Sequence, residues 1–238
     1  MTFVTFQLIV LVEVIDRAPK RIQWAVALIV PFTKEINDRI LDRLVTKAAL
    51  SDNLVQAKFI GKISINVAYS FWIAVTMATM TTTATGYVLL AINYFIDLML
   101  CYRVIKLDNM VITVDCMISR HQSMRNEVLT ELILNEIIAV LAPVAFIGTF
   151  LIAYYGPNRN NLKVVCKLRQ SKVVDINSFL MPVFEMTVLD SGSLIISGVL
   201  LWCFCRINIW EEYCRTIKKY WHHLAFWGGT FICAVSFI

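Results

Sequence analysis

The stretch SFWIAVTMATMTTTATGYVLLAINYFIDLML, residues 70–100, decides the fold, because no formal charge interrupts it before Asp97. The wider segment from Ile63 to Tyr102 carries Asp97 as its one charged residue. As a single α-helix this segment would be about 60 Å long, roughly twice the ~30 Å hydrocarbon core of a bilayer. The threonine-rich run that ends in Gly86 favours a turn, because these residues are poor helix formers. The sequence therefore predicts a helical hairpin with spans at 63–81 and 86–104.

The composition agrees with a chain that is largely embedded in lipid. Of the 238 residues, 58% are hydrophobic and 16% are charged. An ordinary soluble domain is about 45–50% apolar and about 25% charged. The net charge of +5 could suggest nucleic acid as a partner. The basic residues, however, stand in short groups between apolar runs, and no nucleic-acid-binding motif accompanies them, so we expect the lipid bilayer as the partner and no nucleic acid.

Further apolar runs extend the hairpin into a polytopic bundle. The remaining predicted spans are a partial span at 2–15 and full spans at 132–155, 186–206 and 221–238. The fold class is therefore an all-α polytopic transmembrane helix bundle with about five or six spans. Both ends of the sequence stop inside or beside apolar runs, which indicates a single membrane domain, 1–238, that is a fragment of a longer chain.

The segment 34–55 has a different pattern. Its apolar residues recur at helical spacing, from Ile36 to Ala48, and charged residues fill the other positions. This pattern is typical of an amphipathic helix, which we place at the cytoplasmic face. The hairpin supports this side, because Lys58 and Lys62 flank one outer end and Arg103 and Lys106 flank the other, and basic flanks face the cytoplasm. The loops 34–62 and 107–130 are then cytoplasmic and are where we expect protein partners.

Four polar residues are the candidate site. Asp97 is the first choice, because a carboxylate at membrane depth must pair, take up a proton or face water. Asn93 stands four residues earlier, on the same face of the helix. Glu136 is expected near the cytoplasmic start of its span, and Asp190 at the opposite membrane face. Pairing with a neighbouring helix and an interfacial position are the simpler structural interpretations of these acids.

No pattern indicates an enzyme, a cofactor or a metal site. The motifs GxSxG, HExxH, GxGxxG and the P-loop do not occur in the sequence. The seven cysteines include no CxxC pair, and the Cys203–Cys205 pair has no partner residues at zinc-ligand spacing. We therefore expect an integral membrane protein that is not an enzyme, without choosing which membrane.

Three functions are consistent with these features. The leading hypothesis is that the protein moves or gates a small solute or an ion through a polar seam that includes Asp97. The alternatives are a receptor-like membrane sensor that signals through its cytoplasmic loops, and a structural membrane subunit. A polar seam that contacts water would distinguish the first from the third.

Overall fold

The computed structural model describes residues 29–48, 54–79, 83–113, 118–155 and 176–236, together with scattered positions before residue 29. Every regular element in these ranges is an α-helix, and none of the described residues forms a β-strand. The all-α prediction is therefore confirmed. The predicted partial span 2–15 lies largely outside the described residues.

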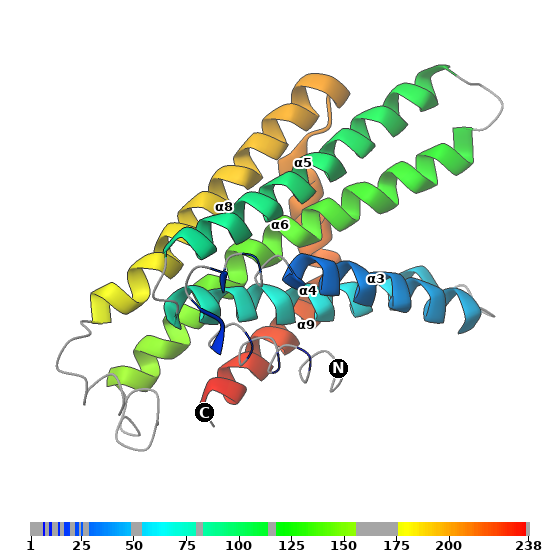
Figure 1. Cartoon of the computed structure of the whole chain (residues 1–238). Helices are drawn as coiled ribbons and strands as arrows, with labels where there is room; N and C mark the ends of the chain where they lie inside the picture. Colours follow the sequence, from blue (N-terminus) through cyan, green and yellow to red (C-terminus); the bar gives the residue numbers. More distant parts are fainter. Residues whose placement is uncertain are drawn as a thin grey trace.

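Six helices make up this part of the chain. They are α3 (Ile29–Ala48), α4 (Leu54–Thr79), α5 (Thr83–Thr113), α6 (Ile118–Tyr155), α8 (Ile176–Cys205) and α9 (Ile209–Ser236). The separation of α4 from α5 falls between Thr79 and Thr83, inside the threonine-rich run. After this point α5 diverges from α4 and packs along α6 and α8 (Figure 1).

Three of the helices are long and apolar enough to cross a membrane. Their candidate spans are Gly86–Met110 in α5, Gln122–Ile152 in α6 and Leu180–Cys205 in α8. The segments expected to span at 63–81 and 221–238 do form helices, within α4 and α9, but neither is among these three. The sequence-based count of about five or six spans is therefore not confirmed, because the described residues contain three candidate spans.

The three helices with candidate spans run side by side, each packing on the other two, and α4 crosses them (Figure 1). α4 is the central helix, because eight consecutive residues, 62–69, are all buried and together cover every side of it. α3 packs on α4, and α9 packs on α6 and α4. The apolar part of α4 therefore contacts other helices of the protein.

The outer surfaces of the candidate spans are strongly apolar. Large exposed hydrophobic side chains include Phe95 and Tyr102 on α5, Ile152 on α6, and Trp202 and Phe204 on α8. A soluble monomer rarely exposes so many large apolar side chains along contiguous helices. These surfaces are compatible with contact with lipid.

α3 is amphipathic with its apolar stripe turned outward. Phe32, Ile36 and Leu44 are exposed, whereas Asn37 is buried against α4. Asn37 donates a hydrogen bond of 3.0 Å from Nδ2 to the Tyr69 hydroxyl. The polar face of the helix therefore meets the protein, the reverse of the packing expected for an amphipathic helix on a soluble core.

Candidate functional site

Polar side chains form a layer between two hydrophobic clusters. On α5, Leu89 and Leu90 belong to one cluster and Leu100 and Cys101 to the other, and Asn93 and Asp97 stand between them. On α8, Asp190 falls in the same way between Met186 and Leu201. We call this the central polar layer. Its members are Asn66, Asn93, Asp97, Asn135, Glu136, Asp190, Ser193 and Ser197.

Glu136 is the most buried member of the layer, with no exposed surface. Its Oε1 atom accepts hydrogen bonds from the hydroxyls of Ser197, at 2.8 Å, and Ser193, at 3.3 Å. Its Oε2 atom is buried and accepts no hydrogen bond from any described residue. One carboxyl oxygen is thus fixed by α8, and the other is available for a further partner.

Asp190 also lies inside the group of helices that form the three candidate spans. It is 3% exposed, and its Oδ2 atom has no hydrogen-bond partner among the described residues. The neighbouring Leu189 carbonyl accepts a hydrogen bond from the Tyr94 hydroxyl, which ties α8 to α5. The sequence predicts Asp190 at a membrane face, because the predicted span starts at residue 186. The candidate span begins at Leu180, which puts Asp190 well inside it.

All three acids lie near the middle of their candidate spans. Glu136 was expected near the start of its span, but α6 extends further towards the N-terminus, and the candidate span is Gln122–Ile152. Asp97 is central in Gly86–Met110. The charges that act on Glu136 are those of Asp97 and Asp190, and Asp97 also acts on Asp190. The structure therefore brings the three predicted acids into one electrostatically linked group.

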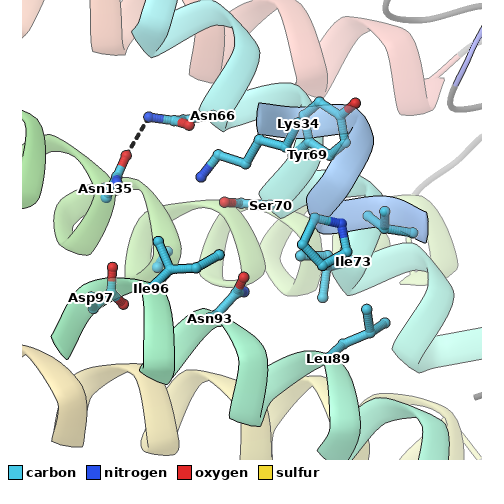
Figure 2. A pocket seen from close by; sticks show the side chains of 13 residues that line it. Lys34, Asn66, Tyr69, Ser70, Ile73, Leu89, Asn93, Ile96, Asp97 and Asn135 are labelled. Atoms are coloured by element: carbon cyan, nitrogen blue, oxygen red, sulfur yellow. Dashed lines mark hydrogen bonds between the residues drawn. The ribbon is translucent and has the colours of Figure 1, made fainter. Parts of the chain in front are cut away.

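Asp97 and Asn93 line a small cavity of about 30 Å³ between α3, α4, α5 and α6. The Lys34 side chain extends from α3 into this cavity, and Asn66 donates a hydrogen bond across it to Asn135 (Figure 2). Lys34 is the cation that acts on Asp97. A cavity of this size has room for about one or two water molecules.

Ala139 of α6 is also one of the residues that line the small cavity. Its backbone carbonyl has an unusual position in the helix. In a regular helix this carbonyl would accept a hydrogen bond from the backbone N–H of residue 143. Residue 143 is a proline inside α6 and has no N–H to donate. Pro143 therefore leaves the carbonyl of Ala139, a residue that lines the same cavity as Asp97, without its usual intrahelical donor.

A second, larger cavity of about 760 Å³ lies next to the first. We call it the charged vestibule, because five cationic and five acidic side chains line it together with apolar residues of α5 and α6. The cations are Lys34, Arg39, Lys58, Lys62 and Arg103, and the acids are Glu35, Asp38, Asp42, Glu127 and Glu131. Its walls come from α3, α4, α5 and α6, the same helices that surround the small cavity.

Ion pairs hold the walls of the charged vestibule together. Lys62 of α4 lies 2.9 Å from Glu131 of α6 and 3.9 Å from Asp42 of α3, measured from Nζ to carboxylate oxygen. Lys58 lies 2.5 Å from Glu127 and 3.3 Å from Asp42. Burial lowers the pKa of Lys58, but its acidic partners outweigh that effect, and the net pKa is raised. Lys58 therefore stays charged and connects three helices.

Several members of the site could not be chosen from the sequence. Asn66 and Asn135 are single amides in apolar runs, so the sequence gives little reason to choose them as site residues. Ser193 and Ser197 are small residues of a kind that usually permits close helix packing, and the structure also makes them donors to Glu136. Lys34 gave no signal, because it belongs to the amphipathic helix, which the sequence analysis placed outside the hydrophobic part of the bundle.

The described residues contain no group of three or more His, Cys, Asp or Glu side chains placed to hold a metal ion. The described part of the chain is thus an all-α protein with three helices able to cross a membrane and a buried polar layer at their centre. No family model matches this chain, and neither a curated protein nor a solved structure matches it.

Proposed function

We propose that this chain is a multi-pass integral membrane protein that moves or gates a small solute or an ion through a seam between α3, α4, α5, α6 and α8. We define the seam as the charged vestibule, the small cavity and the central polar layer. One observation carries the proposal. The two cavities share Pro31, Lys34, Ile96 and Asn135 as walls, so the vestibule adjoins the small cavity that Asp97 lines.

Three physical features support a path over a purely structural interior. Charged groups deep in a membrane are costly and are usually kept for ion or solute pathways. Pro143 removes the helical donor of the carbonyl of Ala139, a residue that lines the cavity, and irregular backbone at membrane depth is tolerated where it lines a cavity. The vestibule carries equal numbers of both charges, which suits a hydrated entrance.

We propose that two further helices, which are not among the three candidate spans, also lie in the membrane. These are α4 and the C-terminal part of α9, which gives five membrane-embedded helices in the described part. The apolar face of α4 then contacts protein where the faces of α5 and α8 contact lipid. The outward apolar stripe of α3, with Phe32, Ile36 and Leu44, contacts the edge of the bilayer.

Water access at position 97 tests the proposal. The variant Asp97→Cys, in a background with the seven native cysteines replaced, is reconstituted into sealed vesicles and exposed to a membrane-impermeant thiol reagent from each side in turn. We expect labelling from one side, because in the proposed seam the vestibule gives water access to position 97. The matched control is Leu90→Cys, two turns earlier on α5 and buried in an apolar cluster, which should stay unlabelled.

Protection of position 97 from both sides would contradict the proposal. It would favour the structural-subunit alternative, in which Asp97 serves to hold helices together. Labelling would be followed by flux measurements with Asp97→Asn, which keeps the size of the side chain and removes its charge.

A further inference from the structure

We propose that the ion moved through the seam is the proton, and that Glu136 and Asp190 bind it in turn with Asp97. This inference rests on the proposed function and names its substrate. It starts from the two buried carboxyl oxygens, Glu136 Oε2 and Asp190 Oδ2, that accept no hydrogen bond from any described residue. Both residues are at least nine-tenths buried.

The hydrogen bonds of Glu136 hold one carboxyl oxygen in place and leave the other as the position for the proton. The two serine hydroxyls donate to Oε1 and so orient the carboxyl group. Oε2 is also buried, and no described residue donates a hydrogen bond to it. A carboxylic acid that carries its proton on Oε2 keeps both serine hydrogen bonds, so protonation and deprotonation require no rearrangement of α8.

The charges around the three acids favour the binding of a positively charged species. The acids from α5, α6 and α8 act on one another, and the cation Lys34 of α3 acts on Asp97. Among the described residues, the other titratable groups that face the acids are Tyr94 and Cys101 of α5 and Tyr213 of α9, which carry no charge at neutral pH. α4 contributes the amide of Asn66. Three carboxylates in an apolar interior with one nearby ammonium cannot all be ionised without a large free-energy cost.

The size of the small cavity favours the proton over larger ions. Its volume of about 30 Å³ holds one or two water molecules but no hydrated metal cation or organic solute. A dehydrated metal cation needs a shell of several oxygen ligands in place of its water. The described residues offer no cluster of three acids or other metal-binding side chains around a common point.

The transfer step needs water and nothing else. A proton leaves the O–H group of one carboxyl, and the bonding electron pair stays on that oxygen as carboxylate. The proton forms a new O–H bond with a water molecule or with the next carboxylate. Asp97, which lines the cavity beside the vestibule, exchanges protons with water. Glu136 of α6 and Asp190 of α8 continue the proton path between the helices.

Proton flux into vesicles tests the inference. The full chain is reconstituted, the membrane voltage is clamped with potassium and valinomycin, and a trapped pH-sensitive dye reports the decay of an imposed pH gradient. We expect proton flux through the wild-type protein and its loss in Glu136→Gln and in Asp190→Asn. The matched control is Glu185→Gln on α8, a more exposed acid bonded to the Tyr87 hydroxyl, which should retain the flux.

Infrared spectroscopy gives a second readout that does not depend on flux. A carboxyl group that carries a proton has a C=O band that is separate from those of carboxylates and amides. We expect this band at neutral pH in the wild-type protein and its reduction in Glu136→Gln. A wild-type protein without the band would overturn the inference, even in a preparation that is inactive.

The outcomes separate this inference from the proposed function. Flux of sodium or potassium without protons would overturn the proton as substrate and leave the seam intact. Absence of proton flux overturns the inference in every case, and labelling at position 97 then decides separately whether the seam is open to water.

Discussion

Asp38 is the clearest titratable group outside the candidate spans. It lines the charged vestibule from α3, and its Oδ1 atom is buried without a hydrogen-bond partner among the described residues. Burial raises its pKa from 3.8 to about 6, and the nearby cations Lys34 and Lys62 reduce the size of that change. The ionised form is therefore disfavoured in the folded protein.

The raised pKa of Asp38 makes the free energy of unfolding depend on pH. Between pH 3.8 and about 6, the folded state binds more protons at Asp38 than the unfolded state does. The contribution of Asp38 is thus most favourable below pH 3.8 and is lost as the pH rises through about 6. At higher pH the ionised Asp38 lowers the free energy of unfolding by at most about 3 kcal/mol, since each pKa unit corresponds to about 1.4 kcal/mol.

We predict that Asp38→Asn raises the free energy of unfolding at pH 7.5. The amide is neutral at every pH, so the variant should also lose the part of the pH dependence between pH 4 and about 6. Chemical unfolding in detergent micelles at several pH values measures both effects. The control is Glu35→Gln, an exposed acid on the same helix. A variant less stable than the wild type above pH 6 would contradict the prediction.

At the scale of the helix, two kinds of ion pair hold α3 and its neighbours. The Lys62 ammonium is 8% exposed and joins Glu131 of α6 to Asp42 of α3. The Arg39–Glu35 pair has a similar length of 2.8 Å, but both side chains are exposed and lie on the same helix. The two ion pairs of Lys62 connect three helices in a largely buried place, whereas the Arg39–Glu35 pair is screened by solvent.

We predict that Lys62→Met lowers the free energy of unfolding by about 2–3 kcal/mol, because it leaves Glu131 without its cation in a half-buried position. Arg39→Met, which also removes a cation from an ion pair, should cost less than about 0.5 kcal/mol. Thermal unfolding of the two variants in the same detergent compares them directly. Equal losses would show that burial does not distinguish the two pairs.

At the scale of the whole molecule, tryptophans report which surfaces contact lipid. Trp202 on α8 is 66% exposed among other large apolar side chains, and Trp72 on α4 is 5% exposed in an apolar cluster. If the candidate spans lie in a bilayer, Trp202 faces acyl chains and Trp72 faces other helices. The chain has six tryptophans, so single-tryptophan variants are needed to observe each one.

We predict that brominated lipids quench the fluorescence of a variant that retains Trp202 and leave a variant that retains Trp72 nearly unchanged. Quenching by bromine requires close contact, so it separates lipid-facing from protein-facing side chains. The remaining tryptophans are replaced by phenylalanine in both variants. Quenching of Trp72 with protection of Trp202 would reverse the assignment of inner and outer surfaces.

Local chemistry was sufficient to predict much of this molecule from its sequence. A long run without charge must be helical in lipid, and threonines with a glycine favour a break, so the all-α class and the separation of α4 from α5 follow from residues 63–102. A carboxylate in an apolar run is conspicuous for the same reason. Asp97, Asn93, Glu136 and Asp190 could therefore be selected as candidates without a structure.

Tertiary packing decided what those residues contact. The direction of the apolar stripe on α3 depends on what surrounds that helix, and its periodicity alone cannot show whether the stripe faces protein or lipid. The pairing of Glu136 with Ser193 and Ser197 depends on the register between α6 and α8. The approach of Lys34 to Asp97 depends on α3 packing over α4 and α5. Contacts between distant segments leave no periodic signal in a single sequence, because they arise when helices meet.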